Sequence, residues 1–234
     1  MEGNMNFNFE NDNELFDKMR KYLYTAVVGD ILDKMGFYHQ FLSPRIRPLD
    51  EKMIVAGRAM PVLEADAAGD FMQGHNKLLQ KSFGLMLEAL DDLKENEVYI
   101  CSGASPSYAL VGELMCTRMK MLKAAGTVAV GYHRDTSGIL QLGFPCFSYG
   151  SYSQDQAPRG KVIDYRVPIE IDGIRVEPGD IIFGDRDGVL VIPQKMEGEV
   201  LRQALEKALG EKEVATAIKN GMSVCEAFAR YGIM

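Results

Sequence analysis

The sequence predicts an α/β fold with a mixed sheet and C-terminal helices. Helical and strand patterns alternate up to about residue 150, and short strands separated by Asp-Gly and Pro-Gly-Asp turns follow. The first pattern is typical of parallel βαβ units and the second of antiparallel pairing. We expect one domain over residues 1–193, which begins with a helical segment, and a helical extension over 194–234. This extension would pack on the same domain or on a neighbouring subunit.

The N-terminal segment is expected to form two helices. Residues 12–22 pass from polar to apolar at helical spacing. Thr25 can cap the second helix, in TAVVGDILDKMG, because a threonine side chain can accept a hydrogen bond from a free amide. Gly36 would end this helix, since glycine adopts the left-handed backbone found at helix ends. Loop residues then continue to about Glu51.

The middle of the chain is expected to form consecutive βαβ units. KMIVAGRAM (52–60) and EVYICSG (97–103) have strand composition, and residues 75–94 between them have apolar side chains at helical spacing. A helix containing Glu113 then leads to the strand TVAVGY (127–132). Because crossover connections join strands that run in the same direction, we expect parallel pairing here.

The last third of the chain is expected to be antiparallel and then helical. KVIDYRVPIEI, GIRV, DIIFGD and GVLVIP are short β segments with tight turns between them. Residues 194–234 alternate charged residues with Leu, Val and Ala at helical spacing, which predicts two closing helices.

Composition excludes several classes of function. A chain of 234 residues with 47% hydrophobic content can bury a core, and a net charge of −7 without a Lys/Arg-rich tract argues against nucleic-acid binding. No stretch approaches the roughly 18 apolar residues of a membrane span, and the N-terminus lacks a secretory-signal pattern. We therefore expect a cytoplasmic protein that binds neither nucleic acid nor membranes. Dinucleotide and P-loop motifs do not occur.

Sulfur-containing residues are interpreted as core residues. The four cysteines form no CxxC pair, which argues against a zinc site or a disulfide framework. The Met-rich segment 114–122 is expected to be a packed helix face. The cysteines assigned to the core are Cys101, Cys116, Cys146 and Cys225.

One set of residues carries the strongest chemical signal. Glu113 stands near the start of a helical pattern, and the pair Arg134-Asp135 follows after twenty intervening residues, beyond the next apolar strand. One helix-plus-strand unit could therefore bring all three together. Carboxylates are ligands for hard cations, and the arginine guanidinium binds carboxylates through paired hydrogen bonds. This combination suits chemistry on a small, metal-bound anion.

The residues around Glu113 could bind the anion. Gly112 and the peptide amides of Leu114 and Met115 would lie at a helix N-terminus, where free N–H groups favour a carboxylate. The alternative is a simple helix entry. Gly103 and Ser105, in the preceding loop, are weaker candidates for shaping the pocket.

Other polar residues have structural explanations beside functional ones. His133 could transfer protons, but neighbours in an extended segment point to opposite sides, so its side chain could face away from Arg134. His39 and His75 are expected to be peripheral. Asp185 and Asp187 belong to an Asp-Gly turn, which explains them without catalysis.

Several motifs, taken together, resemble the RraA-like family, which includes the divalent-metal-dependent 4-hydroxy-4-methyl-2-oxoglutarate aldolases. They run in the family's order between about Thr25 and Pro193: TAVVGDILDKMG, GELM, VAVGYHRDT, LGFPCFSYG, VEPGD and GDRDGVLVIP. The resemblance implies a three-layer α/β fold of the swivelling α/β/β/α type. It also implies trimers or dimers of trimers with active sites between neighbouring subunits.

The resemblance assigns roles to the candidate residues. Asp135 would bind Mg²⁺ or Mn²⁺, Glu113 would contact the metal through a water, and Arg134 would stabilise an enolate. The amides that follow Glu113 would contact the pyruvyl group of the substrate. Two positions depart from the family: Glu113 replaces the usual aspartate, and Gly138 stands where an acidic residue is often found three positions after Asp135.

The resulting expectation is a metal-dependent carbon–carbon lyase of the class II type. It would act on a small anionic 2-oxo acid, by retro-aldol cleavage or by decarboxylation through a pyruvate-like enolate. Two alternatives stay open. The protein could be a regulator that binds an RNA-degrading enzyme, as some relatives of this kind do, or a lyase that acts on a sugar-acid derivative.

Overall fold

A mixed sheet forms the centre of the molecule in the computed structural model, which describes residues 9–67 and 75–233. The strand order is β1-β7-β5-β3-β2-β11-β12, and β8 also pairs with β2. Its strands are β1 (Arg47–Pro48), β2 (Val55–Asp66), β3 (Glu97–Ser102), β5 (Gly126–Ala129), β7 (Cys146–Ser148), β8 (Gly160–Tyr165), β11 (Ile181–Asp185) and β12 (Gly188–Ile192).

Strand directions divide the sheet into two parts. β2, β3, β5 and β7 run parallel to one another. β8, β11 and β12 join by antiparallel pairing, and β9 (Ile169–Ile171) forms an antiparallel hairpin with β10 (Ile174–Val176). The predicted α/β class, with parallel pairing in the middle and antiparallel pairing later, is confirmed.

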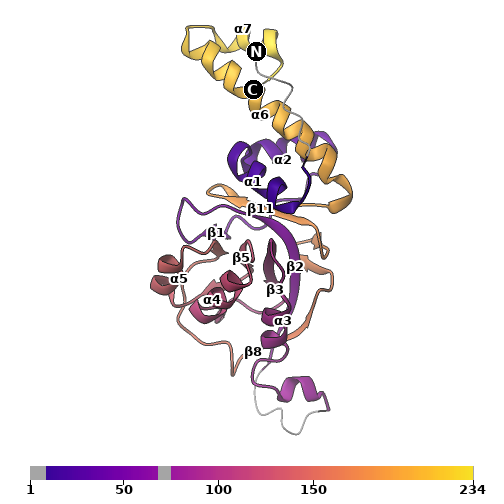
Figure 1. The fold of residues 1–234 in the computed structure, drawn as a ribbon, viewed down its shortest axis with the longest axis vertical. Coiled ribbons are helices and arrows are strands. Elements are labelled where there is room, and N and C mark those ends of the chain that lie inside the picture. Colours follow the sequence, from indigo (N-terminus) through magenta and orange to yellow (C-terminus); the bar gives the residue numbers. More distant parts are fainter. Residues whose placement is uncertain (1–8, 68–74, 234) are drawn as a thin grey trace.

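One group of helices covers the β11 end of the sheet. α1 (Asp12–Tyr22), α2 (Thr25–Lys34) and the first half of α6 (Glu197–Lys219) lie together beside β11 (Figure 1). Their apolar faces share one core with strands β11 and β12, because each helix places buried residues at helical spacing. Members of this core include Phe16, Val28, Phe183, Leu190 and Leu201.

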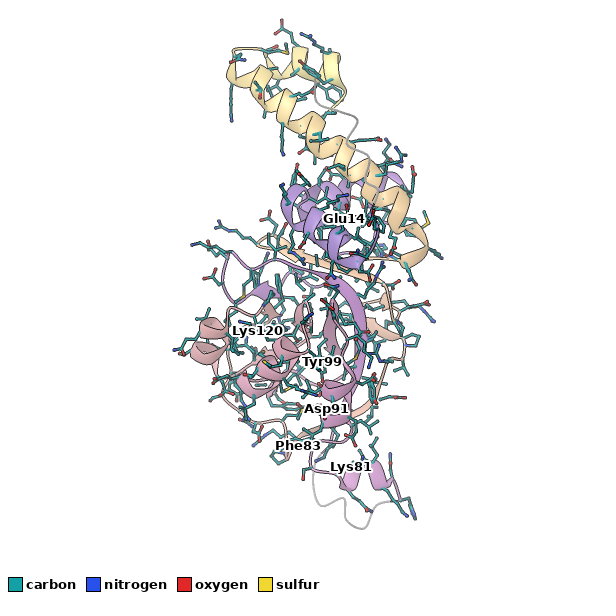
Figure 2. The ribbon with its side chains drawn as sticks, in the orientation of Figure 1. Glu14, Lys81, Phe83, Asp91, Tyr99 and Lys120 are labelled. Carbon is teal, nitrogen blue, oxygen red and sulfur yellow. The ribbon has the colours of Figure 1, made fainter. Side chains whose placement is uncertain are left out.

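A second group of helices covers the parallel strands. α3 (Met86–Asp92), α4 (Glu113–Met121) and α5 (Thr136–Leu142) pack over β3 and β5, with the buried side chains of Tyr99 and Cys116 between them. Figure 2 shows Phe83 and Asp91 in the lower half of the molecule, well away from Glu14 on α1, which lies above the sheet. The two helical groups therefore cover different regions of the same sheet.

The C-terminal helices form an arm. α6 extends beyond α2 away from the body, and α7 (Val224–Tyr231) folds back beside its end (Figure 1). Ser223 and Glu226 form a reciprocal capping box that begins α7. Two helices were predicted here, and both are present. Within the described residues, every helix is too short or too polar to cross a membrane.

Two predicted elements have different bounds in the structure. The strand expected over 52–60 is β2, which begins at Val55 and continues to Asp66. The helix expected over 75–94 is wrong: a short 3-10 helix (Lys77–Gln80) and α3 are separated by Gly84. An added Cβ at Gly84 would lie 2.1 Å from the Val162 carbonyl oxygen, so contact with β8 interrupts the helical pattern.

The predicted cap at Thr25 is also wrong. Tyr24 is the N-cap residue, and Thr25 instead donates from its amide and its hydroxyl to the two carboxylate oxygens of Asp185, both at 2.7 Å. The predicted end of the helix is confirmed, because Gly36 has a φ of +87° directly after the last turn.

The expectation for sulfur-containing residues is confirmed only in part. Cys101, Cys116 and Cys146 are buried, whereas Cys225 on α7 is exposed. The segment 114–122 is not a uniformly packed face, because Met121 is 74% exposed. The sequence marks this segment as apolar but does not show which side of α4 meets the sheet.

Candidate active site

The candidate site lies where two short parallel strands end. β4 (Ala109–Val111) pairs with β6 (Tyr132–His133), and the Arg134 amide continues this ladder by donating to the Val111 carbonyl oxygen at 2.9 Å. Carboxyl ends of parallel strands meet at one edge, so the residues after Val111 lie beside those after His133. The fold therefore places Gly112 and Glu113 next to Arg134 and Asp135.

Asp135 has a backbone conformation that is uncommon for its residue type. Its φ is +60°, in the left-handed region, where aspartate is tolerated better than most residues. Its carboxylate accepts a 3.3 Å hydrogen bond from the Glu113 amide at the start of α4. Nearly half of its side chain is accessible, at 47%. Left-handed non-glycine residues cluster at functional sites, and this one is held at the mouth of a pocket.

Gly112 provides the space that this arrangement needs. A Cβ at this position would lie 2.8 Å from Asp135 Oδ2 and 3.4 Å from Arg134 Nε. Any side chain here would therefore displace the carboxylate or the guanidinium. The first hydrogen bond within α4 runs from the Cys116 amide to the Gly112 carbonyl oxygen. The Glu113 amide donates to Asp135, and the amides of Leu114 and Met115 have no acceptor within the helix.

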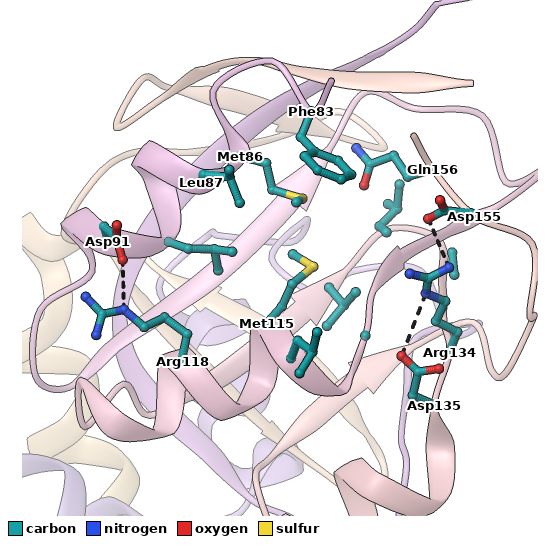
Figure 3. Close-up of a pocket in the computed structure, with 16 residues that line it drawn as sticks. Phe83, Met86, Leu87, Asp91, Met115, Arg118, Arg134, Asp135, Asp155 and Gln156 are labelled. Carbon is teal, nitrogen blue, oxygen red and sulfur yellow. Dashed lines mark hydrogen bonds and ion pairs between the residues drawn. The ribbon is translucent and has the colours of Figure 1, made fainter. Parts of the chain in front are cut away.

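Arg134 is oriented by two acids. Its Nη1 lies 3.0 Å from Asp155 Oδ1, and its Nε lies 3.7 Å from Asp135 Oδ2 (Figure 3). The Arg134 side chain is 39% exposed, so it is partly fixed and still open to a ligand. Sequence reasoning did not find Asp155, because its loop gives no periodic signal and its partner is 21 positions away in the chain.

Glu113 and Gly138 are complementary in shape. A Cβ at Gly138 would lie 2.1 Å from both Cδ and Oε2 of Glu113. The longer acid therefore occupies the space that a side chain at position 138 would take. The long side chain of Glu113 is accommodated because residue 138 has no side chain.

A pocket of about 460 Å³ adjoins this cluster. Arg134, Asp135 and Gly112 lie at one end, and Arg118 pairs with Asp91 at the other (Figure 3). The wall between them is apolar. It is formed by Phe83, Met86, Leu87, Leu90, Ala109, Leu110, Val111, Leu114 and Met115, while Asp155 and Gln156 complete the lining.

A buried acid lies behind the pocket wall. Glu64, on β2, is 2% exposed, and one of its oxygens accepts a hydrogen bond from the pocket-lining residue Gln156. Its other oxygen and the Tyr99 hydroxyl are both buried without a hydrogen-bond partner. Burial raises the pKa of Glu64 to about 8, so the carboxyl is largely protonated at neutral pH. Sequence analysis did not single out Glu64, because β2 also contains Arg58 and Asp66 and the local pattern does not show which of these charged side chains is buried.

The other sequence candidates lie outside the pocket. Both ring nitrogens of His133 are near hydroxyls, with Nδ1 2.6 Å from Ser148 Oγ, and burial lowers its pKa. The Ser105 amide binds Asp66 rather than facing the pocket, and Gly103 is in the same loop. Asp187 is in a β-turn beside Asp185, and the exposed residues His39 and His75 are peripheral, as expected.

The donor set fits a hard divalent cation. Asp135 supplies a half-exposed carboxylate at the end of the pocket, and Mg²⁺ commonly binds one or two carboxylates while keeping several waters. The Glu113 carboxylate lies against Gly138, and Glu113 is not one of the residues that line the pocket. The Asp135 carboxylate lies directly against Gly112, at the N-terminus of α4. Over residues 9–67 and 75–233, no group of three or more His, Cys, Asp or Glu side chains is arranged as a complete metal cage. These residues therefore suit a partly hydrated ion that also binds its substrate.

Comparison with known proteins identifies the family. Residues 25–191 match the RraA-like family, described as Aldolase/RraA. The chain belongs to the RraA-like family. It is 29% identical over 205 residues to a Halalkalibacterium halodurans protein named "Putative 4-hydroxy-4-methyl-2-oxoglutarate aldolase", covering 87% of this chain and 89% of that protein. It is 28% identical over 209 residues to Protein DlpA of Legionella pneumophila, and these cover 88% of this chain but only 32% of DlpA.

A solved structure shows the same RraA-like fold. Streptomyces coelicolor RraAS2, described as an unusual member of the RNase ES inhibitor RraA protein family, superposes with a TM-score of 0.72 at 21% identity. The match covers 86% of this chain and 96% of that one. The fold expected from the sequence motifs is thus confirmed, and the family contains both aldolase names and ribonuclease inhibitors.

Proposed function

We propose that this RraA-like protein is a divalent-metal-dependent carbon–carbon lyase that acts on a small 2-oxo acid. The observation that carries the proposal is the convergence of Arg134, Asp135 and the first turn of α4 at one end of a pocket. A cation, a carboxylate and free amides are the groups needed to hold a 2-oxo acid beside a metal ion. The same groups would support retro-aldol cleavage and decarboxylation, because both reactions form a pyruvate-like enolate.

Mg²⁺ or Mn²⁺, bound directly by Asp135 and through a water by Glu113, would act as a Lewis acid on the substrate's keto group. The substrate carboxylate would accept hydrogen bonds from the amides of Leu114 and Met115, in the first turn of α4 that follows Gly112. These would be backbone contacts, because the amides of the first turn of a helix have no acceptor within the helix.

Arg134 would stabilise the negative charge that develops on the substrate oxygen as the carbon–carbon bond breaks. Asp155 holds the guanidinium in place, so the donor is oriented before substrate arrives. Glu113 would take up or return a proton through a water at the pocket mouth. A lysine Schiff base is not needed for this chemistry.

The assay is pyruvate release from oxaloacetate and from 4-hydroxy-4-methyl-2-oxoglutarate, with and without Mg²⁺ or Mn²⁺. We expect metal-dependent release by the wild type. Absence of release from both compounds and from a 4-hydroxy-2-oxo acid without a second carboxylate, under conditions where the protein is folded by circular dichroism, would overturn the proposal.

A protein-binding regulator is the second candidate. The observation in its favour is a set of exposed apolar side chains on α3 and α4, namely Leu87, Leu114 and Met121. Such side chains often mark contact surfaces. Stoichiometric recovery of a ribonuclease in a pull-down, together with no turnover of any 2-oxo acid, would favour this function. A sugar-acid substrate is less compatible with the structure, because the apolar wall offers few partners for hydroxyl groups.

The same exposed side chains suit contact with further copies of the chain. We infer a homotrimer or a dimer of trimers, in which a neighbouring subunit would complete the pocket mouth. Light scattering on the active protein tests this, and a fully active monomer would contradict it.

A further inference from the structure

The end of the pocket formed by Arg134 and Asp135 is called the reacting end. The rest of the pocket suits an apolar group. Met86 from α3 faces Met115 from α4 across the cavity, and Phe83 closes the wall on the Gln156 side (Figure 3). Leu90 from α3 also lines the cavity. Met86 and Leu90 are 8% and 5% exposed, so this part of the wall belongs to the core. A ligand that fills the pocket contacts these side chains over most of its length.

The polar groups are confined to the two ends. Arg134 at the reacting end already contacts Asp155 and Asp135. At the far end, Arg118 Nε lies 2.8 Å from Asp91 Oδ1, and both side chains are about half exposed or more, so this pair lies at the solvent edge of the pocket and not in its middle. A second substrate carboxylate in the middle of the pocket would lose water and gain no hydrogen-bond donor there.

We propose that the substrate is a 2-oxo acid whose group beyond the reacting carbons is a phenyl ring or a short alkyl chain, rather than a second carboxylate. This inference rests on the proposed function and specifies its substrate class. Gly112 and Arg118 are six positions apart, which on a helix spans roughly 9 Å at 1.5 Å per residue. A ring or a short chain fits that length. Each buried methylene strengthens binding about fourfold by the usual transfer free energy.

The reaction that suits such a compound is cleavage of a 4-hydroxy-2-oxo acid with the apolar group on C4. The C4 hydroxyl loses its proton to a base, its oxygen becomes the carbonyl oxygen of an aldehyde, and the C3–C4 bond breaks. The electron pair passes to C3 and the C2 oxygen as an enolate, which takes up a proton at C3 to give pyruvate. The products are pyruvate and an apolar aldehyde, so no oxidant or reductant is required.

The experiment compares two substrates that share the reacting atoms: 4-hydroxy-2-oxo-4-phenylbutanoate and 4-hydroxy-2-oxoglutarate. Pyruvate release with Mg²⁺ gives kcat/KM for each. We expect at least a tenfold preference for the phenyl compound. Met115→Lys, which places a cation in the apolar wall, should lower that preference tenfold or more. The control Leu140→Lys, at an exposed apolar position on α5 outside the pocket, should leave the ratio within twofold.

A wild-type preference for the dicarboxylate, or an unchanged ratio in Met115→Lys, would overturn the inference. A binding measurement separates its failure from that of the lyase proposal. Thermal-shift titrations with 2-oxo-4-phenylbutanoate and 2-oxoglutarate, in the presence of Mg²⁺, need no turnover. Tighter binding of the phenyl compound without cleavage of either 4-hydroxy acid would support the apolar pocket and reject the lyase. Tighter binding of 2-oxoglutarate would reject the apolar pocket.

Discussion

The chain contains the dipeptide Arg-Asp twice near the carboxyl end of a strand, and the two copies have different surroundings. Arg134-Asp135 follows β6 and lies at the end of a pocket, with Asp135 in a left-handed conformation. Arg186-Asp187 lies in the turn between β11 and β12, where the Arg186 guanidinium pairs with Glu51 on the surface.

Asp185, which precedes the second dipeptide, and Asp135, in the first, differ in how many hydrogen bonds their carboxylates accept. Asp185 accepts hydrogen bonds from the amide and hydroxyl of Thr25 and from the Asp187 amide, at 2.7 to 2.9 Å. Asp135 accepts one long hydrogen bond and has an arginine contact at 3.7 Å. A carboxylate with its acceptor sites filled stabilises the fold, whereas one with free acceptor sites can bind a ligand. The comparison shows that the dipeptide alone does not define a site.

The sharpest test of this contrast is to remove each acid of the two pairs. Asp135→Ala should lower metal-stimulated pyruvate release roughly 10³-fold or more, because the metal contributes several kcal/mol of transition-state stabilisation. Asp187→Ala should change it by less than about twofold, as surface substitutions have small effects. The measurement is kcat/KM with saturating Mg²⁺. Full activity in Asp135→Ala would show that the free carboxylate is not the metal ligand.

The arginines of the two pairs provide a second test. Arg134→Ala should reduce kcat by about 10² to 10³, the usual effect of losing one donor to a developing oxyanion. Arg134→Lys should recover little, since lysine lacks the planar fork that fits a carboxylate. Arg186→Ala serves as the matched control and should retain wild-type kcat. If Arg134→Ala raised KM and left kcat unchanged, the role of Arg134 would be restricted to substrate binding.

The buried acid Glu64 extends the comparison to stability. Its pKa is raised to about 8 in the folded protein, so the unfolded chain loses this proton at a lower pH than the folded chain does. Stability should therefore fall as pH rises from about 4.5 to about 8, by about 1.4 kcal/mol per pH unit from this group alone. Glu64→Gln should flatten that slope in urea unfolding between pH 6 and 8. Equal slopes in both proteins would mean that Glu64 is ionised in the folded state.

Asp185 should matter for folding and not for chemistry. Asp185→Ala leaves the Thr25 amide and hydroxyl without their partner, and each unsatisfied buried group costs about 1–3 kcal/mol. We expect a lower melting temperature with unchanged kcat for the folded fraction. The result that would contradict this is a stable Asp185→Ala protein with impaired turnover.

The smallest effect is expected at Gly138. Gly138→Ala should push the Glu113 carboxylate aside, because the new Cβ would overlap it. The displaced atoms are the end of a flexible side chain, so stability should change little and kcat should fall only a few-fold. Glu113→Asp combined with Gly138→Ala should restore kcat by shortening the acid. Equal kcat values in the single and double variants would show that the contact does not position Glu113.

Local patterns were enough to predict most of the fold. α1 and the parallel core strands β3 and β5 have periodic, well-bounded sequences, so local preference and tertiary packing agree. The error over 75–94 arose because Gly84 approaches β8, a contact that the local pattern does not contain. β4 and β6 have only three and two residues, too few to show a strand period.

The site was partly predictable for the same reason. A helix start and a strand end in one unit must lie close together, which is why Glu113 and Arg134 could be paired in advance. Asp155 and Glu64 reach the site region through loops and pairings far apart in the chain. The apolar wall comes from two helices, and neither helix alone indicates that a cavity lies between them.

The one exposed thiol has a practical consequence. Cys101, Cys116 and Cys146 are buried in the body, and Cys225 is accessible on α7, beyond the end of α6 that lies away from the pocket. A maleimide dye should therefore attach at a single position without any cysteine substitution. Energy transfer between dyes on mixed donor- and acceptor-labelled chains would then report how far apart the arms stand in an assembly, and whether substrate changes that separation.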